Sequence, residues 1–61
     1  MVMEKIFSDI ELAVSWLNSV SGLWGGLTED DQNGCYDMLE TEGFASVRNP
    51  KGEVFTAVMP D

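Results

Sequence analysis

The sequence predicts a small single domain of the α+β class, spanning residues 1–61 in the order helix, helix, strand, strand. Three observations support this fold. Apolar residues recur at helical spacing over residues 3–20, glycines flank an acidic segment at residues 29–42, and residues 44–59 alternate around a turn sequence. A chain of 61 residues has room for one hydrophobic core. We therefore expect two helices packed on a C-terminal β-hairpin.

The first segment has the apolar rhythm of an amphipathic helix. Its apolar side chains recur in steps of three or four residues, which places them along one side of a helix. They are Met3, Phe7, Ile10, Val14 and Leu17. We predict a helix over about residues 3–20, with Gly22 as its C-terminal stop.

A second helix-start signal lies inside this segment. Ser8 and Glu11 have the spacing of a capping box, and Phe7 and Leu12 are placed as a hydrophobic staple. The helix would then begin near Asp9, and the residues before Ser8 would be extended. The unbroken apolar rhythm favours the longer helix, and the state of residues 2–7 stays open between helix and strand.

A glycine-rich loop is predicted at residues 21–28, and it contains Leu23, Trp24 and Leu27. Large apolar side chains in a loop either cap the core or form a contact surface. Capping is favoured because a small domain needs the large apolar area of Trp24 inside. Trp24 is also our one apolar candidate for a partner contact.

The second helix has clear signals at both ends. Thr28 is a suitable N-cap, and Gly43 suits the left-handed position after the last turn, so we predict an acidic helix over residues 29–42. Gly34 lies in its interior, where glycine costs about 1 kcal/mol relative to alanine. This cost predicts that another backbone passes close to Gly34.

The C-terminal segment is predicted to be a hairpin over residues 44–59, turning at residues 49–52 (Asn-Pro-Lys-Gly). This turn pairs Val47 with Phe55 and places both on the face that packs against the helices, so we expect Phe55 to be a core residue. A two-stranded sheet is marginally stable. We therefore expect either the N-terminal segment or a second subunit to add a strand.

The charge of the chain is strongly one-sided, with a formal net charge of -8. Residues 29–42 contain no Lys or Arg, and their carboxylates are Glu29, Asp30, Asp31, Asp37, Glu40 and Glu42. At 100° per residue, Glu29, Asp30, Asp37 and Glu40 project together on one side of the predicted helix. A field of this sign repels nucleic-acid phosphates and anionic membranes, and it attracts basic partners.

The residues expected of an enzyme or a metalloprotein are missing from the sequence. Histidine is absent, and the only cysteine, Cys35, lies on the apolar face of an acidic helix, which offers neither a base nor an electropositive setting. We predict that the chain is not an enzyme and uses no cofactor and no metal. No apolar run reaches the ~20 residues of a membrane span. With no signal-peptide pattern at the start and a lone cysteine, we expect a cytoplasmic protein.

The succession of two helices and a two-stranded hairpin resembles the second half of a winged-helix domain. In that comparison residues 29–43 take the place of the recognition helix and residues 44–59 form the wing. The resemblance implies a dimeric, DNA-associated transcription regulator. Recognition helices that read DNA typically offer Arg, Lys, Asn or Gln, whereas this one offers Asp30, Asp37 and Glu40, so direct nucleic-acid binding is not favoured.

The sequence therefore favours a small acidic accessory or regulatory factor that binds another protein through a basic surface. Its size and charge suit a bacterial or phage-encoded modulator. The candidate contact residues are Glu29, Asp30, Asp37, Glu40 and Trp24. The winged-helix regulator is the alternative function, and a structural or assembly subunit acting through apolar contacts is the third. We also predict a homodimer, formed through the first helix or the hairpin edge. The acidic face is otherwise a solubilising surface.

Overall fold

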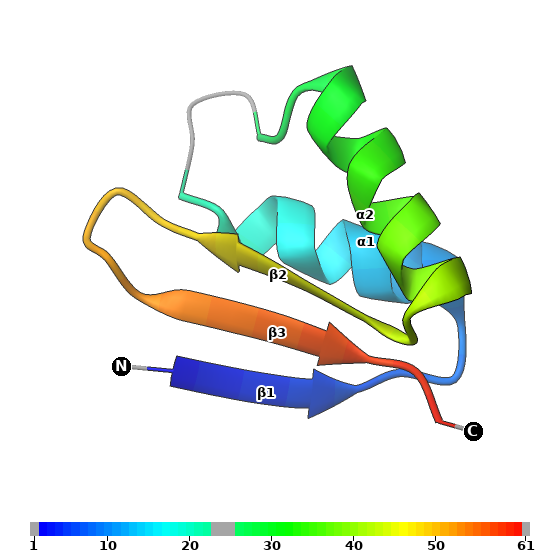
Figure 1. Cartoon of the computed structure of the whole chain (residues 1–61). Helices are drawn as coiled ribbons and strands as arrows, with labels where there is room; N and C mark the ends of the chain where they lie inside the picture. The colour runs from blue at the N-terminus through cyan, green and yellow to red at the C-terminus, as the bar shows by residue number, and fades with distance from the viewer. Residues whose placement is uncertain (1, 23–25, 61) are drawn as a thin grey trace.

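A computed structural model describes residues 2–22 and 26–60 of the chain. Its elements are β1 (Val2–Ile6), α1 (Ile10–Val20), α2 (Glu29–Thr41), β2 (Phe44–Arg48) and β3 (Val54–Val58) (Figure 1). The α+β class is confirmed, and the order is strand, helix, helix, strand, strand.

The predicted long first helix is wrong, because its first residues form β1. This strand pairs in parallel with β3, with Met3 opposite Phe55. α1 begins only at Ile10, where the Asp9 side chain caps the helix by accepting a hydrogen bond from the Glu11 amide at 2.8 Å. The hairpin alone is a weak sheet, and a third strand satisfies one more row of its backbone groups. The extended alternative for residues 2–7 is the one that the structure adopts.

The sheet has the order β1-β3-β2, and β2 and β3 are antiparallel. Val47 lies opposite Phe55, as the turn sequence predicted. The turn closes through a 2.9 Å hydrogen bond from the Gly52 amide to the Asn49 carbonyl, and Gly52 has a φ of 86°. The N-terminal segment, rather than a second subunit, supplies the third strand.

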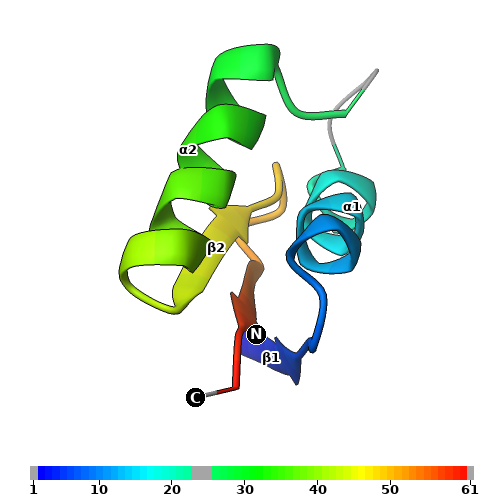
Figure 2. The same cartoon turned by 90° about the vertical axis from the view of Figure 1, so that its right-hand side faces the viewer.

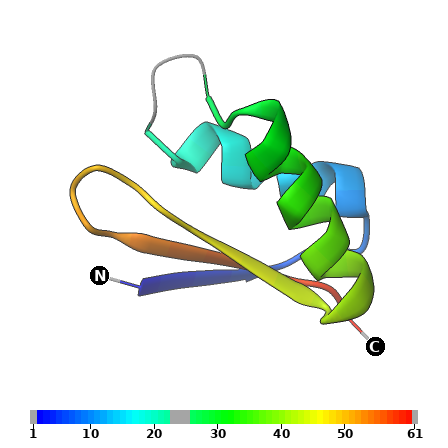
Figure 3. The same ribbon diagram turned by 45° about the horizontal axis from the view of Figure 1, so that its top comes forward.

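Both helices lie on the same face of the sheet (Figure 2). α1 packs mainly on β3 and α2 on β2, and the two helices run in different directions across that face (Figure 3). The core lies between helices and sheet, and its buried residues are Ala13, Val14, Leu17, Leu27, Cys35, Leu39, Ala45 and Ala57. Phe55 was predicted to be a core residue, but it is only partly buried and meets the Trp16 ring edge-on at the margin of this core.

The helix ends follow the sequence signals. The Thr28 hydroxyl caps α2 by accepting from the Asp31 amide at 3.2 Å, and Gly22 and Gly43 have positive φ just beyond α1 and α2. Among the described residues the prediction of a backbone close to Gly34 is wrong, because a Cβ at Gly34 would meet nothing within 4 Å. Among the described residues, no helix is long and apolar enough to cross a membrane.

Candidate protein-binding site

The outer side of α2 carries the acidic face predicted from sequence, which consists of Glu29, Asp30, Asp37 and Glu40. All four residues are exposed. The opposite side of the helix carries its buried residues, Cys35 and Leu39. The buried side packs on the rest of the domain, and the four carboxylates are exposed to solvent.

Nothing in the described part of the chain neutralises these carboxylates. α2 contains no Lys or Arg, and none of the four carboxylates forms an ion pair with a described residue. The chain's cations lie elsewhere, and one of them has aromatic partners. The Lys5 Nζ is 5.3 Å from the Phe7 ring centroid and 5.9 Å from that of Trp16, within the range of cation–π attraction.

The fifth predicted contact residue, Trp24, lies outside the described residues, as does Leu23. The end of the same loop is well anchored. The Leu27 amide donates to the Asn18 side-chain oxygen at 2.6 Å, and the Gln32 side chain donates to the Leu27 carbonyl at 3.0 Å. These two bonds tie the start of α2 to the end of α1 and bury the Leu27 side chain.

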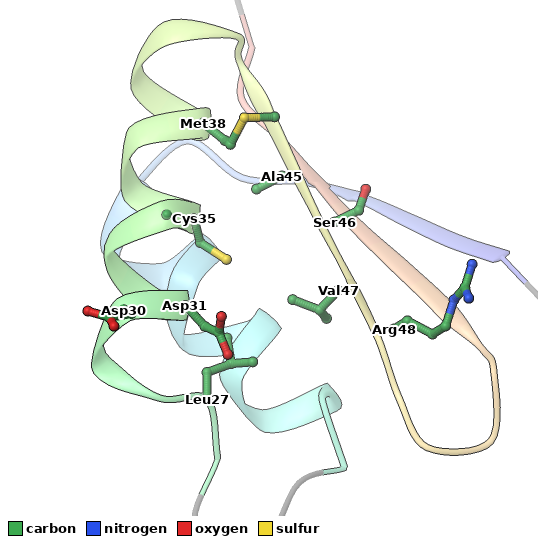
Figure 4. Close-up of a pocket in the computed structure, with 10 residues that line it drawn as sticks. Leu27, Asp30, Asp31, Cys35, Met38, Ala45, Ser46, Val47 and Arg48 are labelled. Atoms are coloured by element: carbon green, nitrogen blue, oxygen red, sulfur yellow. The ribbon is translucent and has the colours of Figure 1, made fainter.

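A groove of about 420 Å³ lies between α2 and β2, and sequence analysis did not predict it. One wall is formed by Leu27 and by Asp30, Asp31, Gly34, Cys35 and Met38 of α2, and the other by residues 45–48 of β2 (Figure 4). The side chains of Asp31, Cys35 and Met38 extend toward β2, whereas the Arg48 side chain extends away from α2. The only sequence signal for this groove was the interior glycine Gly34, which leaves one wall without a side chain.

Cys35 lies at the base of this groove as a neutral thiol. Burial raises its pKa above the ordinary value, and the negative charge of Asp31 raises it further. Thiolate, not thiol, is the nucleophilic form. At neutral pH this cysteine therefore contributes a small apolar side chain to the groove and the core.

A second exposed surface is the face of the sheet that the helices leave uncovered. Ile6, Val58 and Phe44 are register neighbours across the three strands, so they form an apolar row. Ile6 is 68% exposed and Phe44 45% exposed. The homodimer stays a prediction. The first helix and the hairpin edge were its predicted contact regions, and this apolar row is a third region where two copies could meet.

Within residues 2–22 and 26–60, no three His, Cys, Asp or Glu side chains are grouped so that they could hold a metal ion. Comparison of the chain with protein-family models, curated proteins and solved structures gives no significant match. The acidic face and the groove beside it are the surface features of the described residues that bear on function.

Proposed function

We propose that this chain is a small acidic accessory factor that regulates another protein by docking α2 on a basic surface of that protein. The observation that supports this function is the acidic face of α2, which is exposed and has no compensating cation on the same helix. Glu29 and Glu40 are eleven positions apart, so the face is about 16 Å long at 1.5 Å per residue.

The later carboxylates of α2 oppose the stability of the helix, whereas those of the first turn, at residues 29–31, suit the positive end of the helix dipole. Asp37 and Glu40 are three residues apart, and like charges at that spacing destabilise a helix by about 0.2–0.5 kcal/mol. A helix optimised for stability and solubility alone would intersperse Lys among the carboxylates. An uncompensated row of carboxylates fits a surface that attracts a basic partner by steering its encounter.

The test reverses part of the acidic face and leaves the groove intact. Asp37→Lys/Glu40→Lys is the test variant, because neither residue lines the groove. Glu4→Lys/Glu11→Lys is the matched control, because it changes the net charge equally at exposed sites outside α2. Each immobilised protein is incubated with the same cell extract at low and at high salt, and the retained proteins are identified.

We expect the original chain and the control to retain a basic protein at low salt and to release it at high salt. The test variant should lose that protein, and association kinetics with the purified partner should show a lower association rate, because exposed charges act mainly on encounter. Equal retention by the test variant and the original chain would show that the acidic face is a solubilising surface only.

A further inference from the structure

The outer edge of β2 is free to pair with another strand. In the antiparallel ladder, the Asn49 amide donates to the Glu53 carbonyl and the Met59 amide donates to the Gly43 carbonyl. Backbone groups of an antiparallel strand alternate between its two edges. Residues 45 and 47 therefore bond to β3, and the amides and carbonyls of Phe44, Ser46 and Arg48 point to the outer edge. Within the described residues, no strand pairs with that edge.

This free edge borders the α2–β2 groove. The groove is lined by residues 45–48 of β2 on one side and by α2 on the other (Figure 4). A strand laid in the groove would bond to the backbone of Ser46 and Arg48. Its side chains alternate between two faces, and those on the helix side would meet Met38, Cys35 and Asp31. The groove thus offers backbone hydrogen bonds on its β2 side. On its helix side it offers apolar contacts and a nearby carboxylate.

Gly34 is the second observation that points to an occupant. Glycine is unfavourable in a helix interior, and among the described residues no close neighbour requires a glycine at this position. Its φ is not positive, and a Cβ would meet nothing within 4 Å. A glycine in a groove wall allows a second backbone to approach more closely than any side chain would permit. We therefore expect the backbone that approaches Gly34 to belong to another molecule.

The charges around the groove identify the chemistry of that molecule. Two carboxylates line the α2 side of the groove: Asp31 extends toward β2, and Asp30 lies in the same turn. The one cation in the groove lining, Arg48, is on β2, and its side chain extends away from α2. Two copies of this chain paired through β2 would bring two such acidic helices to one seam, which like-charge repulsion opposes. A basic segment would instead be attracted, because its Lys or Arg side chains carry the charge opposite to that of the same carboxylates.

We propose that the groove binds an extended, basic segment of the partner protein as a fourth strand beside β2. The segment carries Lys or Arg near Asp31 and an apolar side chain near Met38. This inference rests on the proposed function, since it assigns the basic partner a second point of contact.

The test begins with a random peptide library displayed against the whole chain, followed by synthesis of the selected peptides. We expect them to combine Lys or Arg with apolar residues at alternate positions. Gly34→Ala should weaken their binding about tenfold or more, because an added methyl overpacks a close contact. Asn33→Ala is the control, since Asn33 is an exposed neighbour outside the groove. Both variants should stay folded, with unchanged or raised melting temperatures.

Amide hydrogen exchange gives the readout that is specific to strand pairing. On binding, the amides of Phe44, Ser46 and Arg48 should become protected, whereas those of Ala45 and Val47 are already bonded to β3. The proposal is overturned if no peptide is selected, if the selected peptides are acidic, if Gly34→Ala binds as well as the original, or if those three amides exchange as before. Protection of the same amides in concentrated protein alone would assign the edge to a second copy and would also overturn it.

The two proposals can fail separately. If Asp37→Lys/Glu40→Lys retains the cell partner while peptides protect the β2 edge, the acidic docking face is wrong and the groove stands. If the extract experiment succeeds and the peptide experiment fails, the acidic face stands and the groove is wrong.

Discussion

The two helices make different use of the same sheet face. α1 buries Ala13, Val14 and Leu17, and its Trp16 ring contacts Phe7 and Phe55. α2 is two residues longer but buries only Cys35 and Leu39, and it leaves a groove along β2. The contrast indicates that α1 buries more apolar side chains than α2 does, and that the accessible groove lies on the α2 side.

Charge follows the same division. α1 contains a single carboxylate, Glu11, whereas α2 contains five carboxylates and a glycine in its interior. A small domain buries a smaller fraction of its surface than a large one does, so few of its residues form the core. The residues buried by α1 can hold the fold while α2 carries charged residues and a glycine that do not stabilise it.

The largest expected effect tests whether stability is concentrated on the α1 side. Leu17 is completely buried, and Leu17→Ala should lower the free energy of unfolding by about 2–5 kcal/mol through lost burial and the cavity left behind. At about 0.05–0.15 kcal/mol per residue, that is a large share of the total stability. Urea unfolding monitored by tryptophan fluorescence measures it.

The matched change on the α2 side is Cys35→Ala. It removes one sulfur atom from a smaller buried side chain and should cost about 1 kcal/mol. Equal losses for Leu17→Ala and Cys35→Ala would show that α2 is held as firmly as α1, and the contrast between the helices would disappear.

An intermediate effect is expected where the two sides are joined. Asn18→Ala removes the acceptor of the Leu27 amide, and a partly buried amide without a partner should cost about 1–3 kcal/mol. Ser46→Ala is the control, because its hydroxyl bonds to Thr56 at an exposed position and its loss should stay within about 0.5 kcal/mol. Thermal unfolding of both variants checks this prediction. A loss of stability in Asn18→Ala no larger than that in Ser46→Ala would contradict it.

Local signals in the sequence were enough to locate most elements. Thr28 and Gly43 identify the ends of α2, and the turn ending at Gly52 sets the register that pairs Val47 with Phe55. These features depend on backbone geometry over a few residues, so they can be predicted without knowing the fold.

The N-terminal strand could not be decided in this way. Met3 and Phe7 fit a helical stripe, and the partner of β1 is β3, about fifty residues later in the chain. Pairing over that separation depends on the assembled fold, which then outweighs a local apolar rhythm. The groove was missed for the same reason, because its two walls meet only after α2 packs on β2. The acidic face needed no such information, since it lies on one helix.

The smallest expected effect concerns the Cys35 thiol at the base of the groove. Its pKa is raised first by burial and second by the charge of Asp31. The unfolded chain loses the thiol proton at a lower pH than the folded chain. The free energy of unfolding therefore keeps its full value below the unfolded thiol pKa of about 9.0 and falls as pH rises from there through the folded pKa. Unfolding free energies of the original chain should therefore fall more steeply above about pH 9.0 than those of Cys35→Ala. Asp31→Asn removes the charge but not the burial, so it should lower the thiol pKa only in part, as alkylation rates measured against pH would show. If alkylation of Cys35 in the folded chain had the pH profile of a free thiol, the cysteine would be open to solvent, and the base of the groove would be wetter than its packing indicates.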